Sequence, residues 1–589
     1  MSKILSLKND ANFYMQRGLK NSDEGNYADA IDDFFTYLRL NPNGGDAVYD
    51  EIAFCYGELG QLEESNKYYH YFLDLNRDSD SGYLGLIQNY ANMDNIHTAI
   101  YYLNEGMRRD VFDGDQDFQA LYEEAKRLNT EAKKPRLLKN RHDEDTVDLA
   151  KSMIMGGELP LAKRILGDIP TDSKAFVDAN NALAYVEFTM GNFSQANEII
   201  DRSLEIKPDD VVALNTKLYC QTRGGDRMGA NETAKKLTQL VPSDDNELFA
   251  IALALISSGY DKQALPLLEK LNENRPATRD CMLSLAQIYY NIKEYEQASD
   301  MITAVRKLYP RDSVVRYYAM QIKSVKPDYI QPLLELPSAE RERRIKLIDS
   351  TFSELSSVER VVRRMSVDEE LEDAVKWLID TAEDSIGSGV GAFLAQSPTY
   401  HHYIREKLLE PNYPVTYKRE FFEVLLKHSK KRTFSLVLGG VQTFHQPKIP
   451  HVKDTENMRQ SFYRAYATAS FLSRNFAKRL RKAYIQVVKT MSSDDFTPFD
   501  IDVATLSAVL YYMAKIERPS SLSAICRFFE TKEENFYDYC NKLGIETEKA
   551  EKVDSVVGEL SDFVEKMLLD ENENGEDENI TENNDNDEE

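Results

Sequence analysis

The sequence predicts an all-α protein in which an α-solenoid, a superhelix of stacked helix pairs, precedes a mostly helical carboxy-terminal domain. The first observation behind this prediction is that alanine and proline both recur at an interval of 34 residues, a period typical of stacked helical units. The second is that apolar residues within each interval follow the helical spacing of three and four. The recurring residues are Ala162, Ala196, Ala230, Ala264 and Ala298, and Pro208, Pro242, Pro276 and Pro310.

Within one interval, residues 177–210, the spacing predicts two helices on either side of a turn at Gly191 and Asn192. Ala196 marks the place where the two helices cross closely, because a larger side chain would force them apart. Pro208 ends the second helix, since proline lacks a backbone N–H and clashes with the preceding turn. One helix pair cannot bury its apolar face alone, so neighbouring units are expected to stack.

This register resembles the tetratricopeptide repeat, which has small residues near positions 8 and 20 and proline at position 32 of each unit. The stretch GNYADAIDDFFTYLRLNP, residues 25–42, places such repeats in the first part of the chain as well. The resemblance predicts about three repeats over residues 11–113 and five repeats over residues 143–312. The expected units are 11–44, 45–78, about 80–113, 143–176, 177–210, 211–244, 245–278 and 279–312.

Two connecting segments are expected around the second array. Residues 114–142 are predicted to form a connecting helix and a basic linker; an irregular repeat that joins the two arrays and a flexible hinge both fit this stretch. Residues 313–337 are predicted to form a capping helix and a proline-rich linker. Pro327, Pro332 and Pro337 end the solenoid, because three prolines within eleven residues forbid a continuous helix.

The 34-residue period is lost after Ser338, and residues 338–566 are predicted to form a helical carboxy-terminal domain. Two β-branched and aromatic runs on either side of two consecutive glycines predict a small β-hairpin near residues 433–446. A long helix is expected over residues 455–491. The stretch 519–544 has the outline of a helix-turn-helix, but its second helix is acidic and would be repelled by phosphates, so we interpret it as a structural helix pair.

Residues 567–589 are predicted to form a disordered acidic tail. The stretch from Asp570 onward contains 11 acidic residues and one apolar residue. It therefore cannot bury enough surface to offset the entropy of ordering. Such a tail increases solubility; alternatively, it folds back and masks the basic region described below.

Composition and motifs argue against several functional classes. The net charge of −27 argues against nucleic-acid or membrane binding by the chain as a whole. The five cysteines are scattered and form no zinc-binding or redox pair, which is typical of reduced residues in a cytoplasmic protein. No phosphate-binding loop, nucleophile elbow or metal-binding helix motif occurs. We therefore expect no enzymatic activity, no cofactor and no metal site.

The resemblance implies that the first helices of the repeats line a concave groove that binds a peptide or helix of a protein partner. An asparagine side chain can bond both the donor and the acceptor of a passing backbone, which suits capture with little sequence preference. The alternative interpretation is that these residues are ordinary polar surface positions. The predicted groove residues are Asn181, Tyr185, Phe188, Asn215, Tyr219, Phe249, Gln287 and Tyr290.

A second hypothesis concerns residues 401–490, which contain 18 Lys and Arg against 6 Asp and Glu. Clustered cations attract phosphate backbones, and interleaved aromatic residues can stack on bases, so this region predicts contact with RNA or DNA. The alternative is that the aromatic residues form core and the cations a solvated face. The candidate anion-binding residues are Arg464, Arg474, Lys478, Arg479, Arg481 and Lys482.

Overall fold

The computed structural model describes most of the chain, and its contacts divide the protein into two compact units. Unit 1 comprises residues 1–123, 136–390 and 409–411, and unit 2 comprises residues 124–135, 391–408 and 412–589. Residues 338–390 group with the repeats by their contacts, while the domain boundaries given above remain predictions. The described residues are 10–93, 95–112, 147, 150–151, 154, 159–382, 385–430, 433–438, 440–448, 450, 452–470, 476–493, 499–514, 522, 525–526, 529–545 and 547.

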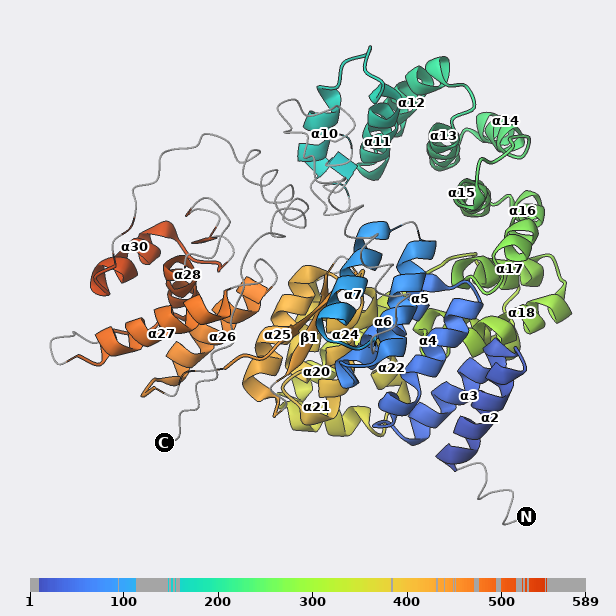
Figure 1. The fold of residues 1–589 in the computed structure, drawn as a ribbon. Coiled ribbons are helices and arrows are strands. Elements are labelled where there is room, and N and C mark those ends of the chain that lie inside the picture. Colours follow the sequence, from blue (N-terminus) through green and yellow to red (C-terminus); the bar gives the residue numbers. More distant parts are fainter. Residues whose placement is uncertain are drawn as a thin grey trace. The chain divides into compact units, whose positions relative to one another are not determined.

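Unit 1 begins with helices that pair with their neighbours in sequence, and this array confirms the predicted all-α class (Figure 1). Short turns separate the two helices of each pair. The predicted connecting helix and linker at 114–142 lie outside the described residues. The helices are α2 (Ala11–Asp23), α3 (Tyr27–Leu40), α4 (Tyr49–Glu58), α5 (Leu62–Leu75), α6 (Asp80–Asn92) and α7 (Ile96–Arg108), with a 3₁₀ turn η1 (Gly45–Ala47) before α4.

The second array consists of further helix pairs, and its 34-residue register has the predicted structural meaning. The five recurring alanines are at most 3% exposed, because each lies where two helices cross. Pro208, Pro276 and Pro310 directly follow the residues that end second helices, and these residues have left the helical region, with φ of −129°, −130° and −124°. Pro242 lies further from its helix, which ends at Leu237. The helices are α10 (Leu159–Gly167), α11 (Phe176–Thr189), α12 (Phe193–Ile206), α13 (Val211–Gly224), α14 (Arg227–Leu237), α15 (Asp245–Ser257), α16 (Asp261–Asn274), α17 (Arg279–Asn291) and α18 (Tyr295–Leu308).

In the four repeats over residues 177–312, the turn between the two helices contains one residue in the left-handed region. Gly191, Gly225 and Gly259 have φ values of 82°, 81° and 82°. Glycine adopts this conformation without a steric penalty. The next residue at the same interval is Lys293, with φ of 76°, so the last repeat makes the same turn at a conformational cost.

The first array packs against the end of the second array through α3, α4 and α18. The Tyr56 hydroxyl donates to the Leu308 carbonyl, and Lys307 Nζ lies 2.6 Å from a carboxylate oxygen of Asp29. The Arg311 guanidinium lies 5.2 Å from the centre of the Phe35 ring. The two arrays are therefore in direct contact at residues far apart in sequence.

A capping helix and further helices follow α18. Helix α19 (Ser313–Met320) continues into the π-helical turn η2 (Gln321–Val325), after which residues 326–337 contain no helix. The subsequent helices are α20 (Ser338–Glu354), α21 (Val358–Met365), α22 (Glu369–Thr381) and α23 (Ser385–Leu394).

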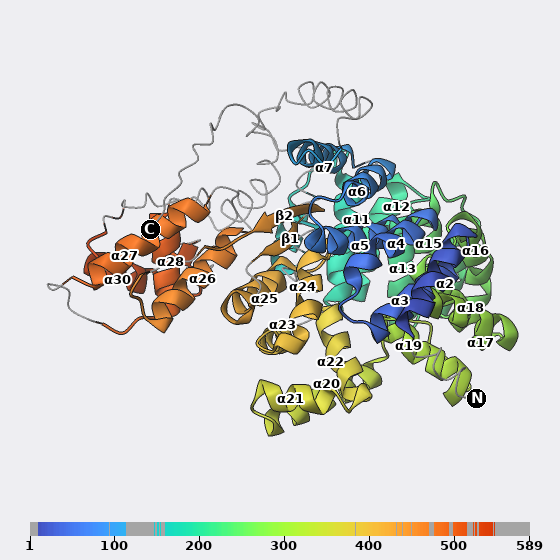
Figure 2. The ribbon, with the colours of Figure 1, turned by 60° about the horizontal axis from the view of Figure 1, so that its bottom comes forward.

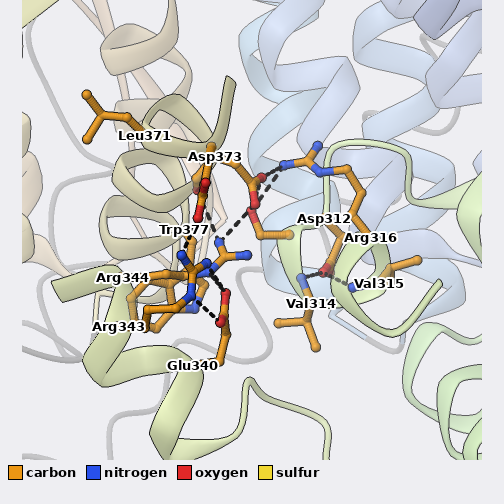
Figure 3. A network of polar contacts seen from close by, with 12 residues as sticks. Asp312, Val314, Val315, Arg316, Glu340, Arg343, Arg344, Leu371, Asp373 and Trp377 are labelled. Atoms are coloured by element: carbon orange, nitrogen blue, oxygen red, sulfur yellow. Dashed lines mark hydrogen bonds and ion pairs between the residues drawn. The ribbon is translucent and has the colours of Figure 1, made fainter. Parts of the chain in front are cut away.

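A polar network connects α19, α20 and α22 (Figure 3). Arg316 and Arg344 both bind Asp373, with Arg344 Nη1 2.9 Å from Asp373 Oδ2. The buried Arg344 also donates through Nε to Glu340 Oε1 at 2.9 Å and lies over the ring of Trp377. Because one carboxylate satisfies arginines from two helices, the three helices are held as one body.

The described part of unit 2 is helical with one small hairpin, as predicted (Figure 2). The strands β1 (Phe434–Leu438) and β2 (Val441–His445) pair antiparallel, with Leu438 opposite Val441. The remaining elements are the 3₁₀ turn η3 (Pro398–Tyr400), α24 (His401–Leu409), α25 (Val415–His428), α26 (Glu456–Ser470), α27 (Ala477–Met491), α28 (Val503–Met513) and α30 (Glu533–Lys542).

The prediction of one long helix over residues 455–491 is wrong, because α26 and α27 are separate helices that pack on each other. The rings of Phe462 and Tyr484 have centroids 4.9 Å apart, and those of Tyr466 and Phe476 are 4.8 Å apart. The chain therefore reverses to bury these aromatic residues between the two helices. The predicted acidic tail, 567–589, lies outside the described residues.

Candidate protein-binding surface

The first helices α11 and α13 are neighbours and present two asparagines near their amino-terminal ends. Asn181 and Asn215 are 4% and 8% exposed. Asn181 Nδ2 donates to Asp210 Oδ1 at 2.8 Å, and the same oxygen accepts the Ala213 N–H at the start of α13. The Oδ1 atoms of both asparagines are buried without a hydrogen-bond partner. Two buried acceptors beneath this surface thus lack the hydrogen-bond partner that a buried acceptor normally has.

Next to these amides lies a row of aromatic rings. The centroids of Tyr185 and Phe188 are 6.5 Å apart, and those of Phe188 and Tyr219 are 6.1 Å apart. Tyr185 is 47% exposed, while Phe188 and Tyr219 are half-buried. Burial raises the pKa of Tyr219, although a hydrogen bond with Ser257 opposes the shift. Half-buried Phe249 packs against the same core cluster as Tyr219. The row therefore extends from solvent into the core of the array.

At the other end of the array, Gln287 and Tyr290 contact the chain itself. Gln287 is fully buried; its Nε2 donates to the Leu333 carbonyl at 2.8 Å, and its Oε1 accepts the Leu333 N–H at 3.1 Å. The Tyr290 hydroxyl donates to the Pro327 carbonyl. We call residues 326–337 the proline segment. The structure thus separates the predicted groove residues into a set on α11, α13 and α15 and a set on α17 that contacts the proline segment.

Several residues that bind the proline segment were not predicted from the sequence. Asn291 makes the same double contact as Gln287, because its Nδ2 donates to the Ile330 carbonyl at 2.6 Å and its Oδ1 accepts the Ile330 N–H at 2.8 Å. Arg279 donates to the Leu334 carbonyl at 3.3 Å. One signal was available: Asn291 lies four residues after Gln287 and so shares its helix face.

The candidate anion-binding residues of unit 2 have different surroundings. Arg464 Nη2 lies 2.9 Å from Glu530 Oε2 and 3.3 Å from the Phe529 carbonyl, so its charge is already paired. Arg479 and Arg481 are half-buried, whereas Lys478 and Lys482 are exposed on α27. Arg474 lies outside the described residues.

The described aromatic residues among these cations form core. Phe462, Tyr463, Tyr466, Phe476 and Tyr484 are all buried. They are therefore not available for stacking on bases in this structure. The sequence could not distinguish the two roles, because core and stacking aromatic residues have the same helical spacing.

The metal-ligating and thiol groups of the described residues bear on the expectations from the sequence. None of their His, Cys, Asp and Glu side chains form a group of three or more that could hold a metal ion. All five cysteines are free and buried, and burial raises the pKa of Cys55, Cys281 and Cys540 to about 12, away from the thiolate form. Within the described ranges, no helix combines the length and the apolar character that a membrane crossing requires.

The family profile that matches this chain agrees with the last unit of the repeat register, 279–312. The tetratricopeptide repeat family profile matches residues 280–312, while no curated protein matches the sequence. Among solved structures, the human IFIT1 dimer with m7Gppp-AAAA is similar at 11% identity, covering 71% of this chain and 94% of its own, with a TM-score of 0.27. Yeast Tom70 is 12% identical, covering 90% and 96%, with a TM-score of 0.19. The P58(IPK) TPR domain is 14% identical, covering 64% and 100%, with a TM-score of 0.17.

Proposed function

The chain is a tetratricopeptide repeat protein, and from this premise we propose that it is a non-enzymatic scaffold that binds an extended segment of a protein partner. The proposed binding surface is the groove expected along the first helices α11, α13 and α15. Its contact residues are Asn181, Tyr185, Phe188, Asn215, Tyr219 and Phe249. The cytoplasm is the proposed location, on the basis of the five free cysteines.

The observation that carries this proposal is the pair of buried, unpartnered Oδ1 atoms of Asn181 and Asn215. A buried acceptor without a partner costs about 1–3 kcal/mol. A ligand N–H that reaches such an oxygen removes that cost. Exposed Tyr185 beside the two amides supplies apolar area for a ligand side chain. The surface therefore offers both elements of peptide capture, hydrogen bonds for the backbone and contact area for side chains.

The test is selection of peptides from a random library displayed on phage, with the full chain as bait. We expect the selected peptides to lose about tenfold or more in affinity for the variant Tyr185→Ala with Asn215→Ala, since a lost contact and a lost hydrogen bond together are worth about 1.4 kcal/mol or more. Asn231→Ala on the exposed face of α14 is the matched control and should leave affinity unchanged. Selected peptides that bind the double variant as tightly as the unaltered chain would refute the proposed surface.

A second candidate function is contact with RNA or DNA through α27. Its specific support is that Lys478, Lys482 and Lys489 are exposed on one helix face, opposite the buried face that contains Leu480 and Val487. Such a row of cations would bind phosphates without base stacking, and the affinity would fall steeply with salt.

This candidate is tested by titrating single-stranded RNA with the full chain at low and moderate salt. Changing the three lysines to glutamate should abolish a salt-dependent shift. The matched control changes three lysines of the repeats, Lys235, Lys262 and Lys270, to glutamate. No binding at low salt, or equal loss in both triple variants, would exclude specific contact through α27.

A further inference from the structure

The proline segment is held by side chains that bind its backbone. Besides the double contacts of Gln287 and Asn291, four side chains donate to its carbonyl groups. The donors are Tyr290 to Pro327, Lys293 Nζ to Asp328 at 3.2 Å, Arg279 to Leu334 at 3.3 Å, and the Tyr318 hydroxyl to Glu335 at 3.1 Å. The segment therefore runs antiparallel to α17 and is bound as a peptide ligand would be.

Only a few side chains of the proline segment are buried. Ile330, Pro332 and Leu336 are buried, whereas Asp328, Tyr329, Gln331 and Glu335 are exposed. Recognition thus depends on the extended backbone and on apolar residues at relative positions one, three and seven. Proline at the third position favours this extended form and lowers the entropy lost on binding.

The connection between α19 and the proline segment is strained. A π-helical turn, Gln321–Val325, ends α19, and Lys326 follows with φ of 52° and ψ of 58°. A π turn is rare and often lies at functional sites, and a left-handed lysine is costly because it carries a Cβ atom. Release of the proline segment would allow both to relax, so strain in the connection opposes the closed arrangement.

We propose that α17 and α19 form a second peptide-binding site, which the proline segment occupies as a tethered ligand that a partner's segment displaces. The partner ligand is an extended protein segment with an aliphatic residue, proline two positions later and leucine four positions after that. Backbone capture makes the exchange chemically simple, since every peptide presents the same N–H and C=O groups to Gln287 and Asn291. This site is separate from the surface on α11 and α13, so either proposal can fail without the other.

The tethered proline segment competes with a partner's segment for the same site, so it determines the affinity that the partner needs. A short connection gives an intramolecular ligand an effective concentration in the millimolar range. A free peptide of the same sequence therefore binds the unaltered chain weakly, and binds more tightly once the tethered copy is weakened. This difference distinguishes an exchangeable ligand from a permanent part of the fold.

The experiment uses a fluorescein-labelled peptide with the sequence of residues 326–337 and measures its anisotropy during titration with the full chain. The released variant, Ile330→Asp with Pro332→Asp, weakens two anchors and leaves Leu336 in place beside α20. We expect the peptide to bind the released variant about tenfold or more tightly than the unaltered chain. Adding Gln287→Ala and Asn291→Ala should remove most of this binding, whereas Gln263→Ala, a change of an exposed glutamine on α16, should not.

Hydrogen exchange of the unaltered chain supplies a second readout that does not depend on the stability of the variants. Excess unlabelled peptide should speed exchange at the Ile330 and Leu333 amides, which Asn291 and Gln287 protect. A peptide carrying aspartate in place of Ile330 and Pro332 is the control. The proposal is overturned if the amides keep their protection, or if the folded released variant binds the peptide no better than the unaltered chain. If the chain forms a concentration-dependent dimer that the peptide dissociates, the proposal of a different protein as partner is wrong, and the ligand of the site is a second copy of this chain.

Discussion

The two ends of the second array use amide side chains on their first helices in different ways. On α17, both atoms of the Gln287 and Asn291 amides are bonded to the backbone of the proline segment. On α11 and α13, the Asn181 and Asn215 amides retain buried oxygens without a partner. The same repeat fold thus has one end whose amides are fully bonded and one end whose amides keep unbonded oxygens, and the segment that follows the array makes the bonds at the first end.

The largest effect is expected from removing the amide side chains that bind the proline segment on α17. Gln287→Ala with Asn291→Ala removes four hydrogen bonds of about 1 kcal/mol each, so the local free energy of opening should fall by about 4 kcal/mol. Hydrogen exchange at the Ile330 and Leu333 amides should accelerate by about 100- to 1000-fold. Gln263→Ala is the control. Unchanged exchange in the double variant would mean that other contacts hold the proline segment.

The next prediction compares the scaffold beneath the two surfaces. Ala196 on α12 and Ala298 on α18 are both fully buried at helix crossings. Leucine at either position should cost about 1–3 kcal/mol of unfolding free energy, because a full core cannot accept three extra carbons without strain. Thermal or urea unfolding measures both variants. If both variants lose a similar amount of unfolding free energy, the two ends differ in what binds to them and not in their packing. If one variant loses much more, the helix packing itself differs between the two ends.

A third prediction concerns Asp312, which joins the last repeat to the capping helix. Its carboxylate accepts the Val314 and Val315 N–H groups at 2.8 and 2.9 Å and binds Arg279 Nε at 2.7 Å. Burial alone would raise the pKa of Asp312, but Arg279 and these N–H donors together hold it below the ordinary value of 3.8. Replacement by alanine should cost about 2 kcal/mol, from a lost helix cap and a lost ion pair.

The pH dependence separates the charge of Asp312 from its capping role. Because the pKa is lower in the folded chain, the stabilisation is present above pH 3.8 and is lost as the pH falls through the folded value. Asp312→Asn keeps a capping side chain and should therefore be less stable than the unaltered chain near neutral pH, and this difference should shrink as the pH falls below 3.8. A constant difference across this range would show that the ion pair contributes nothing.

The repeats could be predicted because their signals are local. Buried Ala264 and the αL turn at Gly259 recur at a fixed interval, and each reflects contacts within one helix pair. The occupant of α17 could not be predicted, since Gln287 meets Leu333 only after α19 and η2 have redirected the chain. The sequence also could not show whether Tyr484 is a core residue or a surface residue that stacks on bases. Its burial against Phe462 depends on a chain reversal that helical spacing does not reveal.

The smallest expected effect concerns Lys293. The turn at this position favours glycine, whereas binding of the proline segment uses the lysine side chain. Its φ of 76° is the value that Gly191, Gly225 and Gly259 adopt in the equivalent turns, so Lys293→Gly should relieve backbone strain worth up to about 1 kcal/mol. The same change removes the bond from Nζ to the Asp328 carbonyl at 3.2 Å. Global unfolding should therefore show a small gain in stability, while hydrogen exchange in the proline segment becomes faster. Lys293→Asn, which tolerates the left-handed region but does not reach as far, should show the same two opposite changes with a smaller gain; a parallel change in both measurements would mean that the lysine serves only the turn.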